Sequence, residues 1–487
     1  MQQTQRHHYR PLLEIGVPIV IGQLGTIILG FADTLMIGHH STIELGAAGL
    51  VNNIFTLGLL FYLGFSYGLT PIVGRLFGMG RTDEIGQKVK NSIVANMVVG
   101  LLLMAMMTLL YLNLHNIGQP EELLPIIRPY FLVNLVSIPF VGMFNTLKQF
   151  FDGITRTQVP MWVMIGGNVV NILFNWLLIY GVGPFPELGL LGAGISTMGS
   201  RVVMSIALVV IFFTGRGYVR YRQSLKQSTM TRADFVEMNR LGWPVALQLG
   251  TESAAFTLSC VMVGWLGTIP LASHQIMITI SQLFYLVLSG MASAISIRIC
   301  YFMGQKEYDA MRCCAADGFR MLLVFSAVVS LPIILFRHDI GFIFTDNDEA
   351  CLTVAHLIWI LVIYQFGDGM QYIYANALRG IACVKPMMYY AFIAYFCINL
   401  PVGYVLGFVA GWGIYGIWTA FPIGLPIAGI LFYRRFVKEL RVMAGRSHAG
   451  LYTAYTRKGQ IRRFALFAFY RVRVSWLSLA SRCASSS

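Results

Sequence analysis

The sequence predicts an all-α membrane protein in which twelve transmembrane helices form two pseudo-symmetric six-helix bundles. Its composition is the first reason, because 56% of the 487 residues are hydrophobic and only 11% are charged, against about 25% charged residues in soluble domains. The second reason is a series of apolar stretches, each near the length of about 20 residues that crosses a bilayer. The third is that the second half of the chain repeats the first.

The apolar stretches alternate with polar connections. The first stretch follows two arginines but is too long for a signal peptide and lacks an obvious small-residue cleavage site, so we expect it to be a retained helix. We expect twelve membrane helices near residues 12–37, 46–74, 90–113, 127–150, 159–181, 190–214, 242–265, 270–300, 314–336, 354–380, 387–408 and 412–434.

Charge in the connections predicts the orientation of the chain. Bases follow the even-numbered stretches, whereas acids such as Glu121 and Asp346 follow the odd-numbered ones. By the positive-inside rule, both termini are cytoplasmic, and we expect a plasma membrane of the bacterial inner-membrane type. This placement explains the net charge of +14 without a nucleic-acid partner. Bases after the second to tenth stretches include Arg75, Lys88, Lys148, Arg220, Lys306 and Lys385.

The two halves match at a constant spacing of 226 residues. Six spans separate the copies, so they keep the same orientation in the membrane, and parallel repeats of this kind are a transporter architecture. We therefore expect an N-terminal bundle over 1–214, a cytoplasmic linker over 215–240, a C-terminal bundle over 241–434 and a basic tail over 435–487. Matching pairs include Gly16 with Gly242, Pro18 with Pro244, Gly64 with Gly290, Gly78 with Gly304 and Pro160 with Pro386.

The tail and the cysteines carry weaker signals. Between Arg446 and Arg482 the chain has eight bases and no acid. Aromatic residues within 461–480 are compatible with an interfacial helix on anionic lipid, and equally with a tail that has no part in transport. The eight cysteines are scattered without ligand spacing, so we expect neither a disulfide framework nor a cysteine metal site.

Three acids lie deep in apolar stretches: Asp33 in the first, Glu252 in the seventh and Asp368 in the tenth. A carboxylate at such depth costs about 2.5–3.5 kcal/mol on insertion scales, so each should face a polar interior, a partner or an ion. Gln248 precedes Glu252 by four residues and Tyr364 precedes Asp368 by four, which places each pair on one helix face.

Polar residues also line the fifth and sixth stretches. Asn168, Asn171 and Asn175 form one stripe, and Thr197 begins a polar face on the sixth stretch. One interpretation is that these residues form hydrogen bonds between helices and have no further role. The functional alternative is ion coupling, because carboxyl groups removed from water can exchange protons near physiological pH.

Two further hypotheses concern the acids and a proline. Glu252 and Asp368 can hold Na⁺ or an organic cation between them, and an aromatic ring such as that of Tyr364 can face the cation. Pro18 removes a backbone hydrogen bond below Asp33, so protonation of Asp33 is expected to change how the first helix bends. The alternative is a static kink that serves packing.

At these residues the chain resembles the multidrug and toxic compound extrusion (MATE) family of cation-coupled antiporters, over roughly residues 10–435. The resemblance implies two six-helix bundles around a central cavity that opens to alternate sides. Within the family, the three acids resemble the NorM-type branch, in which the acids of the C-terminal bundle are associated with cation binding. The residues that carry it are Asp33-Thr34, Met36-Ile37-Gly38, Asn171 to Gly181, Gly192-Ala193-Gly194, Glu252, Tyr364-Gln365, Asp368 and Leu378-Arg379-Gly380.

The resemblance also implies a site in the N-terminal bundle. In the DinF-type branch that site uses an acid, asparagines and a threonine, which Asp33, Asn171 and Thr197 match. Asn175 stands where that branch often has aspartate, so a proton site here has one carboxylate fewer.

We therefore expect a secondary antiporter that exports amphipathic, mostly cationic compounds in exchange for H⁺ or Na⁺, without a cofactor. Its partners would be these small molecules and membrane lipids, and it would act as a monomer. The main alternative is a lipid-linked oligosaccharide flippase of the same superfamily, which needs a more cationic cavity. A membrane enzyme would need a clustered catalytic set, and no hydrolase, P-loop or zinc motif occurs at usable spacing. A channel is disfavoured by the repeat.

Overall fold

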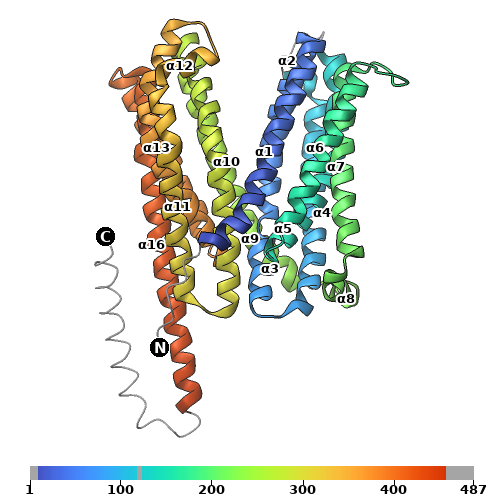
Figure 1. Ribbon diagram of the computed structural model, residues 1–487, viewed down its shortest axis with the longest axis vertical. Coiled ribbons are helices and arrows are strands. Elements are labelled where there is room, and N and C mark those ends of the chain that lie inside the picture. The colour runs from blue at the N-terminus through green and yellow to red at the C-terminus, as the bar shows by residue number, and fades with distance from the viewer. Residues whose placement is uncertain (1–8, 118–122, 457–487) are drawn as a thin grey trace. The chain divides into compact units, whose positions relative to one another are not determined.

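The computed structural model describes residues 9–117 and 123–456, with only the backbone described over 446–456. In this part of the chain, twelve helical segments are long and apolar enough to cross a membrane, as the sequence predicts (Figure 1). The α-helices are α1 (Tyr9–His40), α2 (Thr42–Ser66), α3 (Leu69–Gly78), α4 (Thr82–Leu112), α5 (Leu124–Gly153), α6 (Gln158–Ile179), α7 (Gly189–Thr214), α8 (Val219–Gln227), α9 (Arg232–Gly264), α10 (Thr268–Gln305), α11 (Tyr308–Leu335), α12 (Arg337–Ile340), α13 (Asp348–Gly380), α14 (Lys385–Phe392), α15 (Leu400–Tyr404) and α16 (Gly413–Thr456).

Short helical segments complete the chain. Two stretches of the eleventh span are π-helical, and the connections contain 3₁₀ turns. The π-helical segments are η5 (Ile393–Asn399) and η6 (Val405–Val409), and the 3₁₀ turns are η1 (Leu114–Ile117), η3 (Arg216–Tyr218) and η4 (Gly341–Ile343).

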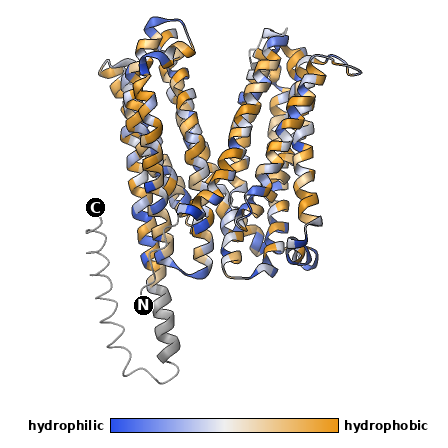
Figure 2. Ribbon diagram, in the orientation of Figure 1, coloured by the Kyte–Doolittle hydropathy of each residue, from blue (hydrophilic) through white to orange (hydrophobic). Residues whose placement is uncertain are grey.

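Several helices begin where a polar side chain caps the first turn. Ser41 accepts a hydrogen bond from the Glu44 amide, and Thr231 accepts one from the Asp234 amide. Such caps satisfy backbone donors that have no partner inside the helix. Along the helices, apolar residues cover most of the length, and hydrophilic residues gather toward the ends (Figure 2). This pattern fits helices whose middle parts face lipid.

The helices pack as two groups. Lines of close helix contact, which we call seams, join the two groups. In the first group α7 contacts α5 and α6, and α1 contacts α6; in the second, α13 contacts α10 and α11, and α9 contacts α14. The described residues up to Phe436 form one compact unit, and the described residues from Val437 onward belong to a second. α9 begins at Arg232, inside the predicted linker 215–240, while α8 packs on α4. The predicted tail, including the possible interfacial helix over 461–480, lies mostly outside the described residues.

The contacts along the seams are made by residues that the 226-residue repeat relates to each other. Gly290 of α10 faces Val20 of α1, and the equivalent Gly64 of α2 faces Ala246 of α9. At each glycine the neighbouring helix is so close that a side chain would collide with it. The contact of Gly74 with Cys300 relates a position to its own repeat partner, so it marks the pseudo-twofold axis.

These close contacts share one end of the membrane helices. They involve the first half of α1 and α9, the end of α2 with α3, and the end of α10. The same end carries a charged cluster in which Lys88 Nζ on α4 contacts Asp234 at 2.6 Å and Glu237 at 2.5 Å on α9. Arg75 on α3 contacts Glu237 at 3.0 Å.

Several bases that we expected in connections lie inside helices, among them Arg75 in α3, Lys88 in α4 and Lys148 in α5. We placed Lys148 in the connection after the fourth stretch, but it lies inside α5, where its Nζ contacts Asp152 Oδ2 at 3.0 Å. Both side chains are mostly buried. The acid one helical turn away allows the base to remain inside the helix.

Candidate functional site

The polar residues predicted in the first half of the chain meet at one place. Asn175 Nδ2 on α6 donates hydrogen bonds to Asp33 Oδ1 on α1 and, at 3.0 Å, to Asn171 Oδ1. Asn171 lies 3.3 Å from Thr197 Oγ1 on α7. Both asparagines are fully buried and Asp33 is partly buried. The spacing of four residues in α6 brings both amides to the same carboxylate.

The amides leave hydrogen-bonding capacity at this place. Asn175 Oδ1 is buried and has no partner. With the Asn171 amide in the orientation that satisfies both of its atoms, its nitrogen donates to Asp33 at 3.0 Å and its oxygen accepts from Thr197. The site therefore has oxygen atoms available for a proton or a hard cation, which prefers oxygen ligands.

Sequence reasoning missed a base next to this group. Arg201 lies one turn after Thr197 on α7, and its charge acts on Asp33. Its Nη1 donates to Ser137 Oγ at 2.6 Å on α5. The sequence does carry a signal for it, because Arg201 is an ionisable residue inside an apolar stretch, as are the three acids.

The predicted acids of the second half are both buried and lie within electrostatic range of each other. Glu252 on α9 is 8% exposed and Asp368 on α13 is 4% exposed, and their charges act on each other. Glu252 Oε2 is buried without a hydrogen-bond partner. In the described part of the chain, neither acid forms an ion pair with a base. Two carboxylates in one buried place favour binding a proton or another cation.

Aromatic side chains surround these two acids. Tyr364 on α13 lies within electrostatic reach of both acids, and its ring lies 5.8 Å from that of Phe421 on α16. Phe256 on α9 stacks on Phe421 at 5.1 Å. Faces of aromatic rings attract cations, so this group can hold an organic cation as well as a proton.

The sequence analysis did not identify most of these aromatic residues. Tyr395 accepts a hydrogen bond from Gln371 Nε2 at 2.8 Å and lies beside Glu252. It is fully buried in the π-helical segment η5. A π-helical turn changes which residues face inward, so regular helical spacing does not identify Tyr395. Tyr285 joins α10 to the same group, because its hydroxyl shares a hydrogen bond with that of Tyr372. Tyr372 lies one turn after Asp368 on α13, where regular helical spacing does identify it.

The two remaining predicted residues have simpler surroundings. Gln248 is buried one turn before Glu252 on α9. Pro18 is buried inside α1, which continues through it as one helix. The structure therefore brings Asp33, Asn171, Asn175 and Thr197 into one group, and Glu252, Asp368 and Tyr364 into another. Among the described residues, no group of three His, Cys, Asp or Glu side chains is arranged to hold a metal ion.

Repeated helix bundles with isolated polar groups at depth define a class, the membrane transporters built from parallel repeats. The chain belongs to the MatE family, whose sequence profile matches residues 18–177 and 244–405. It is therefore a transporter of the MATE type and not an enzyme.

Named relatives and solved structures agree with this assignment. The chain is 28% identical over 448 residues to the multidrug resistance protein NorM of Photobacterium profundum, covering 88% of this chain and 95% of that protein. It is 26% identical over 442 residues to the multidrug resistance protein NorM of Aliivibrio fischeri, covering 90% and 96%.

Among solved structures, a MATE protein in the bent conformation has a TM-score of 0.83 at 17% identity, over 91% of this chain and 97% of that one. An outward-facing MATE transporter of the MOP superfamily has a TM-score of 0.82 at 17% identity, over 91% and 100%. At this identity the similarity concerns the fold.

Proposed function

We propose that this protein is a multidrug efflux antiporter that exports amphipathic, mostly cationic compounds in exchange for H⁺ or Na⁺. The observation that carries the proposal is that Glu252 and Asp368 are both buried and that neither has a basic partner among the described residues. Such a pair needs a proton, Na⁺ or an organic cation. The NorM relatives, which are named multidrug resistance proteins, support the choice of drugs as substrates.

Exchange follows from competition for these carboxylates. A protonated or Na⁺-bound pair has little attraction for a cationic drug, whereas the ionised pair attracts it through charge and through rings such as those of Tyr364 and Phe256. Because only one kind of cation is held at a time, release of the coupling ion on one side permits binding of the drug. The group around Asp33 supplies a second place where the coupling ion can bind.

The bundles provide the alternation. The seams of close glycine contacts hold them together at one end, and we infer that these contacts separate when the transporter opens toward that end. The basic residues Arg75 and Lys88 at this end support a cytoplasmic location for it. We accordingly propose a plasma membrane protein of the bacterial inner-membrane type, active as a monomer, with both termini in the cytoplasm.

The test uses the full chain in liposomes that contain a fluorescent lipophilic cation. A pH gradient and a Na⁺ gradient are imposed separately, and dye movement is followed. We expect movement with one gradient, reduced to the liposome background in Asp368→Asn and Glu252→Gln. Asp346→Asn is the matched control, because Asp346 is an exposed acid in a connection. Asp33→Asn shows whether the first bundle takes part in coupling.

Two results would overturn the proposal. Equal dye movement in Asp368→Asn, Glu252→Gln and the unaltered protein would exclude the second-half acids as the exchange site. No movement of several dyes with either gradient would exclude multidrug antiport and favour the oligosaccharide flippase. Arg201 is a half-buried base beside the first group of polar residues, and such a substrate would use it. Retention of a pyrophosphate-linked lipid that is lost in Arg201→Gln would therefore support that alternative.

A further inference from the structure

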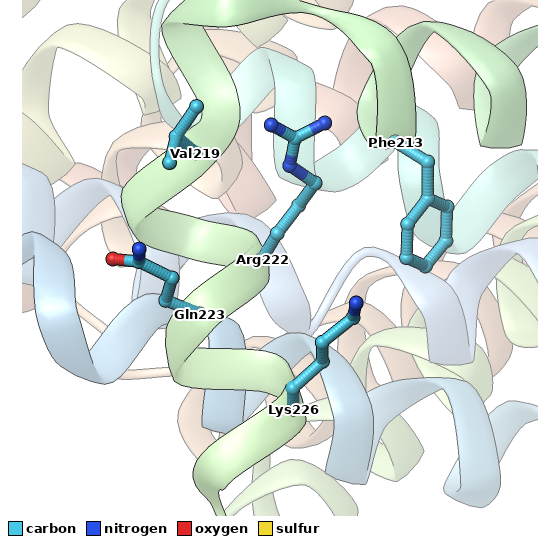
Figure 3. A pocket seen from close by; sticks show the side chains of 5 residues that line it. All are labelled: Phe213, Val219, Arg222, Gln223 and Lys226. Carbon is cyan, nitrogen blue, oxygen red and sulfur yellow. The ribbon is translucent and has the colours of Figure 1, made fainter.

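A hollow of about 250 Å³ lies beside α8 at the end of α7, lined by Phe213, Val219, Arg222, Gln223 and Lys226. Figure 3 shows Arg222 and Lys226 extending from one side of α8 toward Phe213. The two bases are four residues apart, and therefore one helical turn from each other. The hollow combines two positive groups with apolar walls.

The opposite face of α8 is firmly packed. The ring of Tyr221 lies 5.3 Å from that of Phe150 on α5, and Gly86 on α4 allows the backbone of α8 at Tyr221 and Leu225 to come close. The Lys90 ammonium donates to the Ser228 carbonyl at 2.7 Å just after α8. The basic face is thus held in a fixed position, which lowers the entropic cost of binding a ligand there.

Within the described part of the chain, the bases on this face have no partner of opposite sign. Residues 215–232 include five bases and no acid. Among the described side chains, neither Arg222 nor Lys226 forms an ion pair. Like charges one turn apart repel each other, so an anion placed between them would stabilise α8.

The end of α7 predicts that the hollow lies at the level of lipid headgroups. α7 is long and apolar enough to cross a membrane and ends at Thr214, so its last turn is expected near the membrane boundary. Phe213 is 43% exposed and Val219 is 39% exposed. Apolar surface on the membrane side and bases on the water side match the two parts of a phospholipid.

We propose that this hollow binds one anionic phospholipid. Its phosphate lies between Arg222 and Lys226, and the beginning of its acyl chains covers Phe213 and Val219. The bound lipid then connects the membrane to the segment between the two bundles, because α8 is packed on α4 by its other face. This site is separate from the buried acids and does not depend on which compounds are transported.

The experiment measures lipid retention by native mass spectrometry on the full-length protein. Delipidated protein is incubated with phosphatidylglycerol, or with phosphatidylcholine as the zwitterionic control. We expect the unaltered protein to retain one phosphatidylglycerol more than Arg222→Gln/Lys226→Gln, with about thirtyfold weaker binding in the variant. Arg216→Gln/Arg220→Gln is the matched control, since it removes the same charge from exposed residues of the same segment.

Further variants distinguish a specific lipid site from general electrostatic attraction between the bases and anionic lipids. Arg222→Lys keeps the charge and should keep the lipid. Gly86→Ala keeps both bases but displaces α8, so it should weaken retention although the charge is unchanged. Equal losses in the two double variants, or equal retention of both lipids, would overturn the proposal. Displacement of the lipid by millimolar inorganic phosphate would also overturn it, because the hollow would then be a site for soluble anions.

Discussion

Asp33 lies between two kinds of neighbour, the amides of α6 and the guanidinium of Arg201 on α7. The amide of Asn175 donates to it directly, whereas Arg201 is held by Ser137 on α5. The carboxylate therefore keeps a permanent donor while the base stays attached to a different helix. An acid arranged in this way can gain or lose a cation without losing its position.

Asn175→Leu should lower the free energy of unfolding by about 1–3 kcal/mol, because the buried carboxylate loses its donor. Asn168→Leu is the matched control on the same helix. The Asn168 amide nitrogen is buried without a partner, so its replacement should cost less than about 1 kcal/mol. Thermal unfolding in detergent measures both changes. A larger loss for Asn168 than for Asn175 would contradict the assignment.

Residues defined by charge were predictable from the sequence, and those defined by shape were not. Glu252 and Asp368 are costly in a membrane wherever they lie, so depth alone identifies them. Phe256 and Phe421 are ordinary apolar residues until the fold stacks them beside the acids. The inward position of Tyr395 depends on a π-helical turn, and no residue pattern in this stretch predicts such a turn.

At the scale of helices, α1 and α9 carry equivalent prolines, Pro18 and Pro244, inside continuous helices. A proline leaves one carbonyl without its helical partner and permits bending. Both prolines lie close to the glycine contacts of the seams. By bending these two helices, a change at Asp33 or Glu252 can therefore affect the contacts between the bundles.

Pro18→Ala should leave the protein folded, because alanine restores the missing helical hydrogen bond. We expect it to reduce the amount of drug moved per coupling ion, measured from parallel dye and ion fluxes in liposomes. Pro332→Ala, at an exposed proline inside α11, is the control and should keep the ratio. Full coupled transport in Pro18→Ala would show that the proline serves packing only.

The charged cluster of α3, α4 and α9 gives a second prediction for helices. Lys88→Met leaves Asp234 and Glu237 without their shared base and should destabilise the protein by about 1–3 kcal/mol. Arg81→Met removes a base whose ion pair with Glu84 is exposed, 58% and 42%, and should cost about 0–1 kcal/mol. Chemical unfolding compares the two variants. If they cost the same, the cluster does not hold α9 to α4.

For the whole molecule, the repeat makes two distant glycines equivalent. A side chain at Gly64 would meet the backbone of Ala246, and one at Gly290 would meet Val20. We expect Gly64→Leu and Gly290→Leu each to slow transport about tenfold or more. Gly49→Leu on α2, where the space is open, should stay within about twofold of the unaltered rate. Loss in one seam variant alone would show that the seams are not equivalent in function.

The overall architecture was predictable because a membrane limits the choices. Apolar length sets the spans and the 226-residue repeat sets their grouping. Details at the ends of helices could not be predicted from the sequence, since they depend on local partners. Lys148 remains inside α5 because Asp152 lies one turn away, and α9 begins early at Arg232 because Thr231 caps it.

The seams also bear on how the chain is assembled during synthesis. Gly16, Gly64 and Gly74 enter the membrane with the first half, whereas Met291, Ala246 and Cys300 arrive with the second. Until then, the first bundle presents narrow glycine-lined strips to lipid tails. Small residues let another helix approach closely, so glycine-lined strips favour association between membrane helices. Until its own second half is made, the unfinished chain is therefore open to pairing with other helices at these strips, including those of a second copy.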